Sequence, residues 1–227
     1  MKYIVLGLGY FGRALATQLT EAGYEVIAAD KNIHIVEQLK DRITHTVCLD
    51  STDKEAVASL PLKESDAVIV AIGEDEGASL LTTALLKQLN VKRIIGRVVS
   101  DLQKTVLEAM QIEEFIMPEE DTAERLALRL GNIDIVDSFK VSEKYSIVET
   151  VVPQSCIGLT LKEANLTNKY KVLIMTTIKT SLQKKGGEVK AEKEASGIAH
   201  SDTLLEKDDV LVVFGEMTDI QKMMKME

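Results

Sequence analysis

The sequence contains few of the residues on which several classes of protein depend. Its 227 residues include no Trp and only two Cys, 4% of them are aromatic, and the formal net charge is −9. Aromatic stacking platforms for single-stranded nucleic acid are therefore not expected. The acidic balance argues against a general basic face for DNA, RNA or an anionic membrane. Cys48 and Cys156 form no C-x-x-C pair, so we expect buried, reduced thiols and neither a disulfide framework nor a zinc knuckle.

Long apolar runs are also missing. The sequence contains no stretch of about 20 apolar residues, so no transmembrane helix is expected. The first residues, MKYIVLGLG, lack the pattern of a signal peptide, because a glycine turn interrupts a short apolar run. Any action at a membrane would therefore require a partner. The length is sufficient for one large domain or two small ones.

Two patterns of apolar residues divide the chain. As far as MPEED, Val- and Ile-rich runs such as EVIAAD and DAVIVAIG, apolar on both faces, alternate with segments of helical spacing. This alternation predicts the α/β class, with a Rossmann-like doubly wound parallel sheet, and Asp101 is predicted to cap one helix. Runs such as YSIVETVVP and DDVLVVFG then predict a second, smaller α+β domain, with a hairpin tip at Gly186–Gly187. The predicted domains are residues 1–136 and 137–227.

A glycine-rich loop follows the first predicted strand. The stretch YIVLGLGYFGRALATQL contains G-x-G-x-x-G at Gly7, Gly9 and Gly12, and Asp30 ends the next strand. Gly7 permits a tight turn, Gly9 lets the backbone approach a pyrophosphate, and Gly12 lets the helix pack closely on the sheet. The helix N-terminus attracts phosphates. Asp30 is expected to accept hydrogen bonds from ribose hydroxyls and to repel a 2′-phosphate, which disfavours NADP.

Residues for catalysis are hard to find. A hydride-transfer enzyme usually needs an acid or base beside the nicotinamide, but His34, His45 and His200 read as solvated surface residues. The carboxylates of PEED, residues 118–121, have two interpretations: acids that favour a helix N-terminus, or a site for a cation that accompanies phosphates. The sequence thus favours a nucleotide sensor over an enzyme. An NAD-dependent oxidoreductase with a small substrate domain is the alternative, and a ligand-free interaction module is a third interpretation.

Several motifs in a fixed order resemble a known family. IVLGLGYFGRALATQLTEAGYEVIAADKN, CLDSTD, DAVIVAIGED, LLTTALLKQLNV and IMPEEDTAERLA are similar to the regulator-of-potassium-conductance domain, called RCK or KTN, of TrkA/KtrA-type subunits of bacterial potassium uptake systems. Residues 144–149, LKEANLTNKYKVLI and LEKDDVLVVFG resemble the companion C-terminal RCK domain. The resemblance covers nearly the whole chain.

The resemblance implies a gating subunit that is not an enzyme. In this family the N-terminal domains dimerise and form an octameric ring beneath a membrane-embedded potassium translocating subunit of TrkH/KtrB type, at the cytoplasmic face of the cell membrane. The ligand would be an adenine nucleotide, namely NAD(H), ADP or ATP, with a divalent cation such as Mg or Ca. The nucleotide-binding residues that the resemblance implies are Gly7, Leu8, Gly9, Tyr10, Phe11, Gly12, Asp30, Lys31, Asp50, Ser51, Ala71, Ile72, Gly73 and Arg97, and Glu119 is the implied metal ligand.

Two positions depart from the family pattern. The KtrA-type loop reads GLGRFG, and its arginine assists recognition of a terminal phosphate, whereas this chain has Tyr10 at that position. Because tyrosine carries no positive charge, the site is not expected to select ATP over ADP in the usual way. NAD(H), ADP or AMP becomes the more credible ligand. Some members bind cyclic di-AMP in the C-terminal domain. Thr167 stands where a basic residue would favour that ligand, which counts against cyclic di-AMP but leaves it open.

Overall fold

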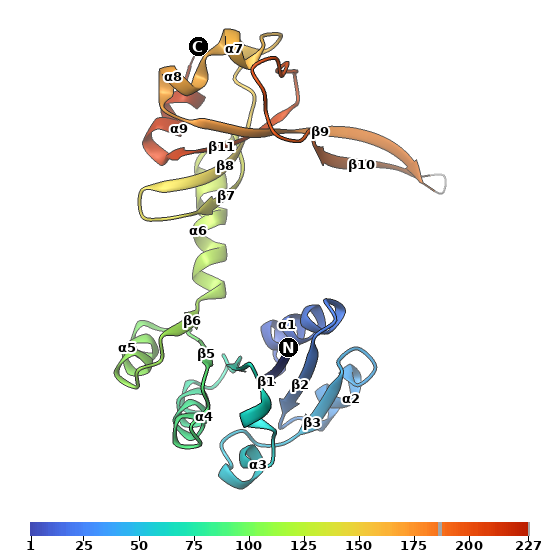
Figure 1. Cartoon of the computed structure of the whole chain (residues 1–227), viewed down its shortest axis with the longest axis vertical. Helices are drawn as coiled ribbons and strands as arrows, with labels where there is room; N and C mark the ends of the chain where they lie inside the picture. Colours follow the sequence, from blue (N-terminus) through green and yellow to red (C-terminus); the bar gives the residue numbers. More distant parts are fainter. Residues whose placement is uncertain (186–187, 227) are drawn as a thin grey trace. The chain divides into compact units, whose positions relative to one another are not determined.

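The first part of the chain forms one parallel sheet with helices on both faces. A computed structural model describes residues 1–185 and 188–226 (Figure 1). The sheet order is β3-β2-β1-β4-β5-β6 with every pair parallel, which is the Rossmann order and confirms the predicted fold class. The elements are β1 (Lys2–Leu6), α1 (Tyr10–Glu21), β2 (Glu25–Asp30), α2 (Ile33–Leu39), β3 (His45–Cys48), α3 (Lys54–Ala58), the 3-10 turn η1 (Leu62–Glu64), β4 (Ala67–Val70), α4 (Glu76–Gln88), β5 (Ile94–Arg97), α5 (Asp101–Ala109) and β6 (Glu114–Ile116).

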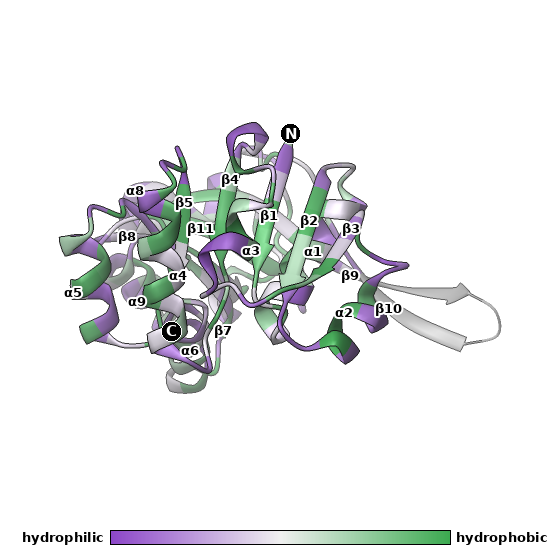
Figure 2. Cartoon of the chain, turned by 90° about the horizontal axis from the view of Figure 1, so that it is seen from below, coloured by the Kyte–Doolittle hydropathy of each residue, from purple (hydrophilic) through white to green (hydrophobic). Residues whose placement is uncertain are grey.

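The alternation of side chains along the central strands explains the two layers of helices. Ile4 and Leu6 of β1 belong to the core that also contains Leu86 of α4 and Leu107 of α5. Val5, which points to the other face, packs in the core beneath α1 and α2. The middle residues of β1, β2 and β4 are therefore apolar and buried whichever face they occupy. Figure 2 draws the middle of these strands in green, the colour of hydrophobic residues. The edge strand β3 is only partly buried, so the expectation of burial on both faces was wrong for it.

The second part of the chain is an antiparallel sheet with short helices. Its strand order is β10-β9-β11-β8-β7, and its core joins sheet residues such as Val148 and Leu211 to Leu166, Ile220 and Met223 of the helices. This confirms the predicted smaller α+β domain. The elements are α6 (Pro118–Gly131), β7 (Ile135–Lys140), β8 (Tyr145–Val151), the 3-10 turn η2 (Gln154–Cys156), α7 (Leu161–Ala164), α8 (Leu166–Tyr170), β9 (Leu173–Lys185), β10 (Glu188–Ala195), β11 (Val210–Glu216) and α9 (Met217–Met224).

The chain divides into two compact units, Met1–Glu119 and Glu120–Glu227. Most of α6 thus lies with the second unit, whereas the sequence pattern placed it in the first. The domain boundary between residues 136 and 137 stays a prediction. The hairpin tip expected at Gly186–Gly187 lies outside the described residues. No helix within residues 1–185 and 188–226 is long and apolar enough to cross a membrane.

Two local expectations were wrong. Ser100, not Asp101, caps α5, because its side chain accepts the Gln103 N–H and Asp101 is already the first helical residue. Cys156 is buried as expected, but Cys48 is exposed because it ends the edge strand of the sheet.

Candidate functional site

The glycine-rich loop joins β1 to α1, and two of its glycines are required by the protein itself. Gly7 has a φ of +95°, and a Cβ there would lie 2.9 Å from Ile72 Cγ1 and 3.1 Å from the Ile72 nitrogen. A Cβ on Gly12 would lie 1.9 Å from the carbonyl oxygen of Gly7. Close approach between the loop, α1 and the end of β4 therefore explains Gly7 and Gly12 without any ligand.

Gly9 differs from its two neighbours in the motif. Its φ of −60° and ψ of −173° are open to any residue, and a Cβ there would meet nothing within 4 Å. Neither strain nor packing among the described residues accounts for a glycine at this position. What the missing side chain provides is open space in front of the loop.

The first turn of α1 has free hydrogen-bond donors that face this space. Its N-cap is Gly9, and no side chain among the described residues caps it. By contrast α2, α3, α4 and α5 are capped by Asn32, Asp53, Asp75 and Ser100 respectively. A helix N-terminus carries unpaired N–H groups and a partial positive charge. The start of α1 is thus able to bind an anion.

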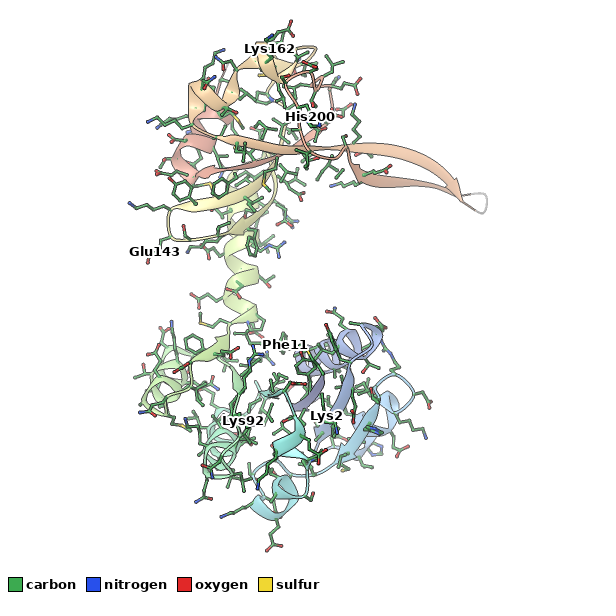
Figure 3. The ribbon with its side chains drawn as sticks, viewed as in Figure 1. Lys2, Phe11, Lys92, Glu143, Lys162 and His200 are labelled. Carbon is green, nitrogen blue, oxygen red and sulfur yellow. The ribbon has the colours of Figure 1, made fainter. Side chains whose placement is uncertain are left out.

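A cleft of about 570 Å³ lies at the carboxyl ends of the strands, where the order reverses between β1 and β4. Figure 3 shows Phe11, at the start of α1, at the end of the sheet away from Lys2. In open α/β sheets this switch point is where ligands bind. The predicted site residues that line the cleft are Gly7, Gly9, Tyr10, Asp30, Lys31, Asp50, Ser51, Ala71, Ile72, Gly73 and Arg97.

Four predicted residues are not part of this lining. They are Leu8 and Gly12, which are buried, Phe11, which is partly buried against the core, and Glu119, which is exposed. The lining also contains residues that sequence reasoning missed, namely Ala29, Asn32, Ile35, Thr52, Glu74, Asp75 and Ala78. Five of these, all except Ile35 and Ala78, lie within two residues of a predicted one, so a wider window around the ends of β2, β3 and β4 would have included them.

Asp30 holds the loop in place as well as facing the cleft. One of its carboxylate oxygens accepts the Leu8 N–H at 2.7 Å, and the other accepts the Asn32 N–H at 2.8 Å. The end of β2 is therefore tied to the glycine-rich loop. The Leu8 N–H already has this acceptor, so the donors left for a phosphate begin at Gly9.

Hydrogen bonds to Asp50 and Ser51 fix the loop after β3. Asp50 Oδ1 accepts the Thr52 N–H at 2.9 Å and the Thr52 hydroxyl at 2.7 Å. These hydrogen bonds, with the charge of Lys31, hold the pKa of Asp50 below its usual value, so it is a carboxylate at neutral pH. Thr82 of α4 donates to the carbonyl oxygen of Ser51 at 3.1 Å and so anchors the loop to the next helix.

Arg97 ends β5 at the floor of the cleft. Its guanidinium lies against Gly73, where a Cβ would be 2.5 Å from Arg97 Cζ, and its Nη1 donates to the Ala71 carbonyl at 3.4 Å. Its Nη2 forms an ion pair with Glu119, and the ring of Phe11 lies 5.6 Å from Cζ. In the described part of the chain, the buried Arg97 Nε has no hydrogen-bond partner. Arg97 is thus a fixed cation with one donor to spare.

Acidic side chains outnumber basic ones around the cleft. The lining contains the acids Asp30, Asp50, Glu74 and Asp75, and the bases Lys31 and Arg97. His34, His45 and His200 are exposed. Among the described residues no three His, Cys, Asp or Glu side chains come close enough to share a metal ion. A cation beside Glu119 would therefore need oxygen ligands from a bound molecule or water.

Comparison with known proteins places the chain in a family. The family model for the TrkA-N domain matches residues 3–118. Ktr system potassium uptake protein C of Bacillus subtilis is 34% identical over 224 residues, which cover 99% of this chain and 96% of that protein. The chain belongs to the TrkA/KtrA family of potassium uptake proteins. Ktr system potassium uptake protein A of the same bacterium is another relative, 29% identical over 97% of this chain and 94% of that protein.

Solved structures share the fold of this TrkA/KtrA family member across both units. The GsuK RCK domain matches with a TM-score of 0.64 at 15% identity and covers 97% of this chain and 46% of that one. The GsuK channel bound to NAD matches with a TM-score of 0.63 at 15% identity, over 98% of this chain and 38% of that one. At this identity the likeness concerns the fold alone, and the chain spans less than half of those proteins.

Proposed function

We propose that this chain is the nucleotide-binding regulatory subunit of a Ktr- or Trk-type potassium uptake system. The observation that carries the proposal is the uncapped start of α1 behind Gly9, which opens into the cleft at the switch point of the sheet. Membership of the TrkA/KtrA family supplies the transport context. An adenine nucleotide in this cleft would act as a signal, without being converted.

We assign a part of the nucleotide to each group in the cleft. The N–H groups of Gly9, Tyr10 and Phe11 would receive the phosphates. The second lone pairs of the Asp30 carboxylate, with Lys31 beside it, would bind the ribose. The loop of Asp50 and Ser51 would border the adenine, and residues 71–73 would line the cleft. Arg97, whose Nε has no hydrogen-bond partner in the described part of the chain, would be a further donor for a phosphate.

The ligand class follows from charge and size. A cleft of about 570 Å³ falls in the range of small-molecule and cofactor sites. Asp30 is a carboxylate held at the end of β2, where a 2′-phosphate would be repelled, so NAD(H), ADP, AMP or ATP fits better than NADP. The solved GsuK channel was bound to NAD, which supports this class.

A divalent cation such as Mg or Ca fits this end of the cleft only as a companion of the phosphates. Glu119 offers one carboxylate there, and Mg²⁺ is commonly held by one or two carboxylates together with substrate phosphates. Since Glu119 now pairs with Arg97, cation binding would turn Glu119 to the metal and free Arg97 for a phosphate. Every charge then still has an opposite charge beside it.

Regulation requires a partner and an assembly. We place the chain at the cytoplasmic face of the cell membrane, bound to a membrane-embedded potassium translocating subunit of TrkH/KtrB type. Homodimers would assemble into an octameric ring there. A nucleotide shifts the ring between two shapes only by its difference in affinity for them, of the order of 1–3 kcal/mol for known allosteric couplings.

The test is a thermal-unfolding panel of AMP, ADP, ATP, NAD, NADH, NADP and cyclic di-AMP, with and without magnesium. A ligand held by the folded state raises the melting temperature. We expect shifts with AMP, ADP, ATP and NAD(H), and smaller ones with NADP. No shift with any of them would favour an interaction module without a ligand. Turnover of NAD with simple alcohols or acids would instead support the oxidoreductase.

A further inference from the structure

An aromatic ring that lines the cleft carries a stacked cation. Tyr10 is the first residue of α1, lines the cleft and is 85% exposed. One turn further along the same helix, Arg13 places its guanidinium carbon 4.1 Å from the centre of the Tyr10 ring. Residues three apart on a helix face one another, and a cation within about 6 Å of a ring centre is attracted to it. Tyr10 therefore holds the charge of Arg13 beside the cleft.

The charge of Arg13 is not neutralised by a carboxylate among the side chains that the structure describes. Within residues 1–180 and 193–226, no Asp or Glu lies within ion-pair distance of Arg13. Arg93, Arg97 and Arg125 each pair with an acid. The charge of Arg13 is thus available to an anion in a way that the charge of Arg97 is not.

The place of this cation on α1 suits a particular part of a nucleotide. The free N–H groups of Gly9 to Phe11 lie at the start of α1 and suit the phosphate nearest the ribose. Arg13 is not itself part of the cleft lining, but it lies one helical turn further along α1 and stacks on the ring of Tyr10, which is part of that lining. A second phosphate that passes the ring of Tyr10 would therefore come within reach of Arg13. A guanidinium can bind two phosphate oxygens at once, which gives it affinity and directional specificity.

We propose that Arg13, positioned by Tyr10, recognises the second phosphate of an adenine nucleotide and makes the cleft prefer di- and triphosphates to the monophosphate. This inference rests on the proposed function, because it needs a nucleotide in the cleft. It also changes the expectation that Tyr10 leaves the loop without a cation for a terminal phosphate. The tyrosine has no positive charge, but its ring positions the charge of Arg13. Arg13 is the specificity-determining residue, and Tyr10 is a positioning residue that acts through it.

The experiment is calorimetric titration of the full chain with AMP and ADP in magnesium-free buffer. Wild type should bind ADP about tenfold more tightly than AMP, the size expected for one hydrogen bond to a charged group. Arg13→Gln should abolish that preference while AMP binding stays within about twofold of wild type. Tyr10→Phe keeps the ring and should keep the preference, whereas Tyr10→Leu should reduce it. Lys104→Gln is the matched control, because it removes a cation stacked 5.4 Å from the ring of Phe115, which, unlike Tyr10, does not line the cleft.

The outcomes separate this inference from the proposed function. If wild type binds AMP and ADP, and Arg13→Gln weakens both equally or neither, the inference is overturned and the proposed function stands. If wild type binds no adenine nucleotide, both fall. Thermal unfolding without ligand checks the folding of each variant. Should Arg13→Gln not fold, Arg13→Lys takes its place. Lysine keeps the positive charge but cannot make the bidentate contact, so the ratio of ADP affinity to AMP affinity should fall. An unchanged ratio would overturn the inference.

Discussion

The substitution Gly9→Ala separates nucleotide binding from folding. In the ligand-free chain the new methyl group would meet nothing within 4 Å, and the φ of −60° suits alanine. Replacing glycine at a compatible position stabilises a protein by about 0.4–1 kcal/mol through the unfolded chain. Alanine is a poorer N-cap than glycine, however, and that loss is of similar size, up to about 1 kcal/mol. The two effects nearly cancel, so the stability without ligand should change by less than about 1 kcal/mol.

Binding should respond very differently. The methyl group would occupy the space through which a phosphate reaches the N–H groups of the first turn of α1. At a ligand concentration of about 100 times Kd, a bound nucleotide stabilises the folded state by about 2.7 kcal/mol. If Gly9→Ala raises Kd about 100-fold, that stabilisation falls to about 0.4 kcal/mol at the same concentration. The thermal shift with ADP should therefore nearly vanish.

Gly12→Ala is the contrasting variant. Its Cβ would lie 1.9 Å from the Gly7 carbonyl oxygen, so the backbone must move. Overpacking of this kind costs about 1–3 kcal/mol or more, and it should lower the melting temperature without any ligand. The assay is thermal unfolding of both variants with and without ADP. A Gly9→Ala chain that keeps the wild-type shift would refute the assignment of the phosphate to this loop.

Three further predictions follow from the ion pairs and hydrogen bonds. Asp30→Asn should weaken ADP about tenfold or more in calorimetry, because an amide offers one acceptor oxygen where the carboxylate serves two N–H groups; unchanged affinity would remove Asp30 from the site. Glu119→Gln should raise ADP affinity a few-fold without Mg²⁺, because Arg97 loses its competing partner, and should abolish any gain from Mg²⁺; an undiminished Mg²⁺ effect would place the cation elsewhere. The hydrogen bond from Arg125 lowers the pKa of Asp137 in the folded chain. The pair therefore stabilises the fold at pH values above the ordinary Asp pKa of about 3.9, and this stabilisation is lost as the pH falls through the lower pKa of the folded chain. Asp137→Asn should therefore lower the free energy of unfolding at pH 7, with the difference from wild type shrinking at acidic pH in denaturant titrations.

The fold could be predicted because its signals are local. Buried parallel strands are read as short Val- and Ile-rich runs, and the glycine spacing after β1 marks the turn that the backbone needs at Gly7 and Gly12. The eleven predicted residues that line the cleft follow the carboxyl ends of β1 to β5, which parallel topology brings to one edge. Ser100 and Asp101 are both good caps, so the helix start was wrong by one residue.

What escaped prediction depends on side chains that meet across the fold. The pairing of Arg97 with Glu119, and the hydrogen bond from the Leu8 N–H to Asp30, join segments whose spacing in the sequence carries no signal. The ring of Tyr10 under Arg13 is different. Its spacing of three on a helix was visible, but the meaning of that pair depends on the cleft beside it.

The central claim is that the cleft of the first unit holds an adenine nucleotide on the free N–H groups of α1. A crystal structure of the full chain grown with ADP tests it most directly. The account predicts ADP phosphates against the N–H groups of Gly9, Tyr10 and Phe11, with the ribose at Asp30. Only solvent beside those groups, at saturating ADP, or ADP bound elsewhere on the chain, would contradict it.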